Sequence, residues 1–331
     1  MMSNSTARVA DEMLVETIDR LFADHSTPER IHAAEGSLDR SVFDAVTEMG
    51  LTTIGVPESL GGSGGTLYDA MAVVCATGYH AVAAPVADVL ASALIGAIHN
   101  VAPGEGITLA VSGNRGAPNC RVPWLPVADR IVCADGSAEA STVTIQSSGV
   151  NYAGEPYAVI EQRVGLAYAG EVLALTRAAQ MAGALQRVSE LCVQYAMERE
   201  QFGKPIGKQQ ILQHYLAQMA GDAATAMASV DNAVDVWSHD GASPRFIRAV
   251  AAAKTVSGRM VAATNRNAHQ LHGAIGFTDE HRLQFWTRRL WAWRDDFGTE
   301  TEWGAVLGRE LVADGGSDLW DFVTSIPPTL A

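Results

Sequence analysis

The stretch REQFGKPIGKQQ, residues 199–210, separates two segments that both have helical spacing. Apolar residues recur at steps of three and four on either side of it, over residues 181–195 and 216–237. The stretch itself contains a Phe-Gly pair, a proline and a second glycine, which interrupt helices. It therefore predicts a connection between two long helices, with Arg199 at the end of the first and Gln210 at the start of the second.

Two more helices are expected further along the chain. Gly241 is placed to end the second helix, and Ser243 with Pro244 forms a good N-cap and first position for a third helix that runs towards residue 272. A fourth helix is expected after Gly298. Several helices of about 30 residues, each roughly 45 Å long, with short connections predict an antiparallel bundle.

The rest of the chain divides by pattern into a helical part and a β part. Residues 1–104 are expected to form an N-terminal helical domain, 105–166 a small β-domain, and 167–331 the helical bundle. The runs that predict strands are ITLAVS, RIVCAD, STVTIQ and AVIEQRVGL. The expected fold class is α+β, mainly α.

Composition limits the partners of the protein. The 331 residues are 48% hydrophobic and 18% charged, as in an ordinary globular protein, and the net charge is −14. That charge argues against nucleic acid or an anionic membrane as a partner. No run of about 18 apolar residues predicts a membrane span, and the start of the chain lacks the pattern of a signal peptide.

Cysteine and histidine usage gives no sign of a metal site. Neither the four cysteines nor the closely spaced His269 and His272 have the ligand spacing of a metal centre. We therefore expect reduced thiols, a cytoplasmic protein and no bound metal.

Two stretches in which glycine or proline interrupts the helical pattern are the candidates for a binding site. A guanidinium such as that of Arg199 at a helix end suits a phosphate or carboxylate, although a surface salt bridge with Glu198 or Glu200 would also explain it. In QLHGAIGFTDEHRL, residues 270–283, the paired glycines permit close approach of a ligand, but they also suit a plain helix stop. On the residues alone, both readings of each stretch remain open.

Taken together, the two stretches resemble signatures of the acyl-CoA dehydrogenase family. REQFGKPIGKQQILQHYLAQMA is similar to the signature at the dimer-facing turn of that family's C-terminal bundle, and QLHGAIGFTDEHRL to a second signature some seventy residues later. MGLTTIGVPESLGGSGG, residues 49–65, is similar to the end of the family's N-terminal helical domain. The resemblance implies the family's fold, a helical domain, a small β-domain and a helical bundle, and the cofactor FAD.

The resemblance also assigns residues to FAD. In the family, the ADP half of FAD reaches from one subunit to the two signature stretches of its neighbour. Carried over to this chain, Arg199 contacts the phosphates, Phe202 packs against the cofactor and Gln210 bonds within the adenosine half. The residues expected to wall the adenine and pyrophosphate are Gln270, Leu271, Gly273, Ala274 and Gly276, with Ala274 in place of a frequent glycine.

The catalytic base of the family is missing. These enzymes remove the acyl α-proton with a glutamate while hydride leaves the β-carbon for the flavin, and the glutamate stands just before a Gly-Thr pair. Here that position is Phe297, and the family's alternative glutamate position is Leu173. Glu171 is close in sequence, but two residues along a helix turn it about 200° away.

The β-domain lacks a second family feature, a loop similar to Thr-Glu-Pro-Gly-Ala-Gly-Ser-Asp that covers the flavin; SGNRGAPNC, residues 112–120, is the nearest polar turn. Half of a FAD site without a base resembles the small subunit of actinobacterial α2β2 acyl-CoA dehydrogenases, many of which act on CoA esters of sterol side chains. That resemblance implies a longer partner subunit with the glutamate, the flavin pocket and most of the acyl-CoA site.

Two alternatives remain. A self-sufficient flavoenzyme would need a relocated base, for which Asp295, Asp296 and Glu300 are the candidates beside Phe297. A non-catalytic scaffold protein with the same fold would need neither base nor cofactor.

Aromatic and basic residues near the C-terminal signature are expected outside the binding site. We expect the tryptophans at a subunit interface, and Arg288 and Arg289 on a solvated face or in ion pairs between subunits. The four tryptophans concerned are Trp286, Trp291, Trp293 and Trp303.

Overall fold

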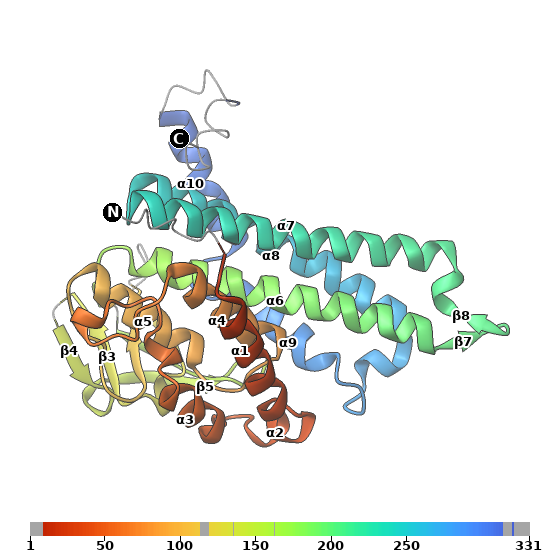
Figure 1. Ribbon diagram of the computed structural model, residues 1–331, viewed down its shortest axis with the longest axis horizontal. Coiled ribbons are helices and arrows are strands. Elements are labelled where there is room, and N and C mark those ends of the chain that lie inside the picture. Colours follow the sequence, from red (N-terminus) through yellow and green to blue (C-terminus); the bar gives the residue numbers. More distant parts are fainter. Residues whose placement is uncertain (1–8, 113–118, 135, 162, 314–319, 321–331) are drawn as a thin grey trace.

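The computed structural model describes residues 9–112, 119–134, 136–161, 163–313 and 320. Most of the SGNRGAPNC turn lies outside these residues. Along the described chain the order is helices, then short strands, then long helices, which confirms the predicted mainly α, α+β class. Figure 1 shows the first helices and the strands gathered around one end of the long helices.

Five helices build the N-terminal part, and polar caps begin four of them. Asp11 accepts a hydrogen bond from the backbone N–H of Leu14, and Thr66 forms a capping box with Asp69. Helix α4 packs along α6 of the bundle, so this part covers the bundle rather than standing apart. The helices are α1 (Glu12–His25), α2 (Pro28–Ala33), α3 (Arg40–Glu48), α4 (Leu67–Tyr79) and α5 (Val86–Ile98).

The β part holds two three-stranded sheets, in the orders β1-β3-β4 and β2-β6-β5. The strands are β1 (Thr108–Ala110), β2 (Asn119–Pro123), β3 (Arg130–Cys133), β4 (Gly136–Glu139), β5 (Ile145–Val150) and β6 (Pro156–Glu161). The expected strand STVTIQ is wrong over its first half, because residues 140–142 form a 3-10 turn and β5 begins at Ile145. Neither β2 nor β4 was predicted, since both are short and polar.

The C-terminal part contains the expected bundle. Its long helices are α6 (Ala169–Glu198), α7 (Gln210–Asp240) and α8 (Pro244–His272), joined by α10 (Glu300–Ala313). Ser243 caps α8 by accepting from the backbone N–H of Phe246, and Gly241 ends α7 at φ 66°. Within the described residues, no helix combines the length and apolar character needed to cross a membrane.

A further helix, α9 (Gln284–Asp295), was not predicted, and it corrects the expectation for the tryptophans. Trp286 and Trp293 lie on its buried face, where their indole N–H groups donate to the carbonyl oxygen of Tyr79 (2.8 Å) and to Glu155 (3.1 Å). Trp303 is also buried, and only Trp291 is exposed. These rings are core of this chain because α9 lies between α6 and the N-terminal part.

Two of the three arginines of α9, Arg288 and Arg289, likewise form ion pairs inside the chain. Arg288 pairs with Glu35 at 2.7 Å, and the buried Arg289 lies 3.5 Å from the buried Glu155. The expectation of a solvated face is wrong for the buried Arg289, whereas Arg288 stays partly exposed, and both residues form these ion pairs within the chain rather than between subunits. Both pairs join α9 to segments of the first two parts.

Candidate cofactor-binding site

A short hairpin closes the end of the bundle where α6 passes to α7. It consists of β7 (Glu200–Gln201) and β8 (Lys204–Pro205), and its turn residues Phe202 and Gly203 both have positive φ, 54° and 78°. Positive φ at both positions is the geometry of a tight type I′ turn. Figure 1 shows the hairpin projecting at the far end of the bundle from the strands of the β part.

Arg199 is held at the base of this hairpin by its backbone. Its N–H donates to the carbonyl oxygen of Tyr195 at 2.9 Å, and its own carbonyl accepts from the N–H of Ile206 at 2.8 Å. The guanidinium, by contrast, forms no hydrogen bond or ion pair with any residue that the structure describes. The salt bridge with Glu198 or Glu200 is therefore not formed, and a positioned cation is left available for a ligand.

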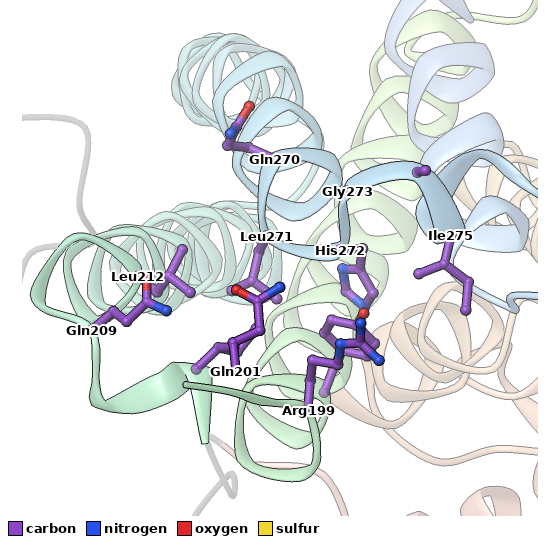
Figure 2. Close-up of a pocket in the computed structure, with 12 residues that line it drawn as sticks. Arg199, Gln201, Gln209, Leu212, Gln270, Leu271, His272, Gly273 and Ile275 are labelled. Atoms are coloured by element: carbon purple, nitrogen blue, oxygen red, sulfur yellow. The ribbon is translucent and has the colours of Figure 1, made fainter. Parts of the chain in front are cut away.

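A pocket of about 460 Å³ opens beside Arg199, between the hairpin, the start of α7 and the end of α8. Its size lies in the range of small-molecule sites. Figure 2 shows Arg199 and Gln201 facing Leu271 and His272 across it. The lining residues are Tyr195, Arg199, Gln201, Ile206, Gln209, Leu212, Gln270, Leu271, His272, Gly273, Ala274 and Ile275.

The two glycines at the end of α8 have different structural roles. Gly273 adopts φ 64° and ψ −143°, a conformation suited to glycine, and it turns the chain from α8 along the pocket wall. Gly276 is needed for packing, because a Cβ there would lie 2.9 Å from the Cβ of His272. The GxxG pattern therefore contains one turn residue and one close-packing residue.

Five of the eight residues expected to contact FAD line this pocket, namely Arg199, Gln270, Leu271, Gly273 and Ala274. Phe202, Gln210 and Gly276 do not. Phe202 is 94% exposed because the turn directs it away from the bundle, and Gln209 takes the place of Gln210 because neighbouring helical residues point about 100° apart. Contact of any of the eight with FAD remains a prediction.

Several lining residues were not expected from the sequence. Tyr195 lies one helical turn before Arg199, so the spacing of four was a usable signal. His272 stood inside the second signature but was considered only as a metal ligand. For Gln201 and Gln209 no sequence pattern pointed to the pocket, since hairpin geometry decides their direction.

A second polar centre lies in the interior, where α6 meets α5 and the α9–α10 connection. The guanidinium of Arg177 is wholly buried and bonds to both carboxylate oxygens of Asp88 (3.1 and 2.8 Å) and to Asp296 (3.1 Å). Gln180 accepts a further bond from it and donates to Thr77 at 3.1 Å. Burial opposes the charge, yet the surrounding carboxylates raise the pKa of Arg177 above its ordinary value.

This closed centre lies where the resemblance places the family's base. The ring of Phe297 lies 5.2 Å from the guanidinium carbon of Arg177, and Leu173 precedes Arg177 by one helical turn on α6. Leu173 is 2% exposed and Phe297 packs against the hydrophobic core. The two residues that the resemblance aligns with the family's glutamates, Phe297 and Leu173, therefore both pack within this chain near Arg177.

The carboxylates beside Phe297 are placed poorly for a base. Asp296 is buried between Arg177 and Arg121, and Asp295 is exposed to solvent. Glu300 receives a hydrogen bond from Arg294 that lowers the pKa of its carboxyl group. A carboxylate that is held by arginine is a weak proton acceptor.

Comparison with known proteins identifies the family. Residues 9–103 match the acyl-CoA dehydrogenase N-terminal domain, and residues 164–299 match the acyl-CoA dehydrogenase C-terminal domain. The chain belongs to the acyl-CoA dehydrogenase family. FAD is the cofactor of this family.

Relatives cover most of the chain. Acyl-CoA dehydrogenase IpdE2 of Mycolicibacterium smegmatis is 28% identical over 84% of this chain and 91% of its own length. A chain of the ChsE4-ChsE5 complex from Mycobacterium tuberculosis has the same fold, with a TM-score of 0.80 at 22% identity over 93% of this chain and 99% of that one. A chain of the Tcur3481-Tcur3483 steroid acyl-CoA dehydrogenase, G363A variant, gives a TM-score of 0.81 at 19% identity over 92% and 98%.

The pocket at Arg199 fits part of FAD. It offers phosphate oxygens a guanidinium that has no partner among the described residues, and Gln270 is one of its lining residues. Ile206, Leu212 and Leu271 supply apolar surface for a flat base. This combination suits the ADP half of the cofactor.

Proposed function

We propose that this acyl-CoA dehydrogenase chain is the non-catalytic subunit of a heteromeric enzyme. Its role is to hold the ADP half of FAD at Arg199 and at the end of α8. A longer partner subunit of the same family supplies the catalytic glutamate, the flavin pocket and most of the acyl-CoA site. When bound, FAD supplies the hydride acceptor for α,β-desaturation of a CoA thioester.

The contrast between the two polar centres carries this proposal. The guanidinium of Arg199 faces an open pocket without a protein partner, whereas Arg177 is buried and bonded on all sides at the family's base position. A chain with this arrangement is able to bind an anion at the first centre. It has neither a base nor accessible space at the second.

The partner and the substrate class are inferred from relatives. Two of the structures with the same fold are two-component complexes by their names, and one of them is called a steroid acyl-CoA dehydrogenase. On that analogy we propose an α2β2 heterotetramer that acts on the CoA ester of a steroid side chain. The analogy concerns the assembly and the substrate class, and the residues of this chain add no contact with a steroid.

The alternatives are less well supported. A self-sufficient flavoenzyme would require Asp295, Asp296 or Glu300 as base, and each is exposed or paired with arginine. A cofactor-free scaffold would have no use for an unpaired arginine in a pocket lined by both signatures. We therefore favour the cofactor-sharing subunit.

The experiment that tests the proposal compares this chain alone with the chain co-expressed with a longer family member encoded nearby. We expect the isolated chain to be colourless and inactive, and the pair to carry about one FAD per heterodimer and to oxidise an acyl-CoA. Flavin absorbance and dye reduction measure the two properties. A yellow isolated chain with dehydrogenase activity would overturn the proposal and direct the search back to Asp295, Asp296 and Glu300.

A further inference from the structure

The pocket at Arg199 contains a second polar group that no bond within the chain explains. His272, the last residue of α8, lines the pocket, and the residue is only 4% exposed. Its Nδ1 lies 2.8 Å from the carbonyl oxygen of Ala268. A carbonyl only accepts, so Nδ1 carries the proton and Nε2 keeps an open lone pair.

The open lone pair is left without a donor. Nε2 is buried and has no hydrogen-bond partner in the described part of the chain. A buried acceptor that stays unpaired is unfavourable, which is a reason to expect a partner from outside the chain. The side chain of Arg199 lies beside His272 in the same pocket and has no hydrogen-bond or ion-pair partner among the described residues, so one ligand in this pocket could reach both side chains.

The surroundings keep the imidazole neutral and orient it. The ring of Tyr195 stacks on it at 4.4 Å between centroids, and the ring of His281 meets it at 4.6 Å. The thiol of Cys192 lies 4.0 Å from Nδ1. Burial, followed by the neighbouring histidines, lowers the pKa of His272 to about 4.

As a neutral acceptor, Nε2 of His272 binds a different part of a ligand from the part that the guanidinium of Arg199 binds. Phosphate oxygens are acceptors and suit the guanidinium, but they cannot satisfy an unprotonated Nε2. The matching groups are N–H or O–H donors. In the ADP half of a dinucleotide, these are the ribose hydroxyls and the adenine amine.

We propose that His272 is a nucleotide-binding residue whose Nε2 accepts a hydrogen bond from a ribose hydroxyl or from the adenine amine, while Arg199 takes the phosphates. The inference rests on the proposed function, because it uses the same pocket. In this proposal His272 recognises the nucleoside, and Arg199 recognises the charge of the phosphates. His272 thereby favours a nucleotide over a simple polyphosphate.

The test follows the ¹⁵N signals of His272 and Arg199 in the full chain, labelled at histidine or arginine and titrated with ADP or with inorganic pyrophosphate. His272→Gln and Arg199→Lys assign the two signals. We expect ADP to shift both Arg199 and the Nε2 signal of His272, and pyrophosphate to shift Arg199 alone. Inosine 5′-diphosphate, which has a carbonyl in place of the amine, tells the two donors apart: a lost response at His272 assigns the amine, and a retained one assigns the ribose.

The remaining outcomes separate the two proposals. A response of Arg199 to ADP with an unmoved His272 overturns the role of His272 and leaves the proposed function intact. An equal response of His272 to pyrophosphate and ADP also overturns it, since the contact would then be to phosphate. If neither residue responds to ADP, the binding function of the pocket itself fails.

An affinity measurement provides a second readout. His272→Phe keeps a ring that can stack on Tyr195 but removes the acceptor, and we expect it to weaken ADP binding about tenfold. His272→Gln retains an acceptor oxygen and should recover part of that loss. Equal ADP affinity of wild type and His272→Phe would contradict the proposal.

Discussion

The two arginine centres of this protein have the same chemistry and opposite surroundings. Arg177 is buried among Asp88, Asp296 and Gln180, so its donors are used within the chain. Arg199 stands at a helix end with its backbone bonded and its guanidinium unpaired beside a pocket. The first arginine contributes to the structure of the chain, and the second is available for a ligand.

The comparison shows which of the two centres has polar groups available for a ligand. The position that the resemblance aligns with the family's base is Phe297, which lies beside an ion-pair network that joins α5, α6 and the α9–α10 connection. The pocket at the far end of the bundle contains two groups, the guanidinium of Arg199 and Nε2 of His272, that have no hydrogen-bond partner in the described part of the chain. Each prediction below changes one centre and uses the other as reference.

The largest effect is expected from Arg177→Met. Removal of the guanidinium leaves the buried Asp88 without its arginine and leaves the buried Asp296 with only Arg121, at 3.6 Å, which should lower the free energy of unfolding by about 3–5 kcal/mol. Denaturant unfolding of the full chain measures this. Arg199→Met is the matched control and should change stability by no more than about 0.5 kcal/mol, because its side chain is exposed and unpaired. Equal losses in the two variants would remove the distinction between the centres.

Arg199→Ala is expected to act on cofactor rather than on stability. Loss of a charge-assisted contact with phosphate should weaken FAD retention by the assembled enzyme about tenfold or more. The flavin-to-protein ratio after dialysis is the readout. Lys204→Ala, at an exposed hairpin position outside the pocket lining, is the control. Full flavin content in Arg199→Ala would refute the assignment of this pocket to FAD.

Lys254 allows a pH test of the closed centre. Its ammonium is buried and donates to the carbonyl oxygens of Arg294 and Gly298, both at 2.7 Å, and burial lowers its pKa from 10.5 to about 7. A lysine with a lowered folded-state pKa binds fewer protons folded than unfolded above pH 7. The free energy of unfolding therefore rises between about pH 7 and 10.5, and this gain is lost again as the pH falls from 10.5 to about 7, below which both states bind the proton.

The expected change in unfolding free energy follows from the lowered pKa of Lys254. Between pH 7 and 9, wild type should gain about 2 kcal/mol of unfolding free energy relative to Lys254→Met. Lys204→Met serves as an exposed control for general pH effects. A flat difference between wild type and Lys254→Met across this range would mean that the ammonium stays charged inside the fold.

The smallest effect is expected from Phe297→Glu. A carboxylate at this position would lie against Arg177 and form an ion pair with it, so it should not act as a base. We expect no dehydrogenase activity from the isolated variant and unchanged turnover by the assembled enzyme, both measured by acyl-CoA-dependent dye reduction. Activity gained by the isolated variant would mean that the closed centre still admits substrate.

The sequence by itself determined the order of the parts, the long bundle helices and the family. These features depend on local periodicity, on capping residues such as Ser243 and Gly241, and on contiguous signatures. Each of these signals lies within a short continuous segment of the sequence. They also located Arg199, because a motif marks the residue regardless of its surroundings.

Only the tertiary structure decided which side chains meet. Arg177 is separated from Asp88 by 89 positions and from Asp296 by 119, so no spacing rule joins them. Gln209 lines the pocket instead of Gln210, and Phe202 faces outward, because helix phase and turn conformation set the direction of a side chain. The open lone pair of His272 is likewise visible only once Ala268 is seen to use the other nitrogen. Side-chain direction and pairing depend on packing between distant segments, and that information is not present in any local stretch.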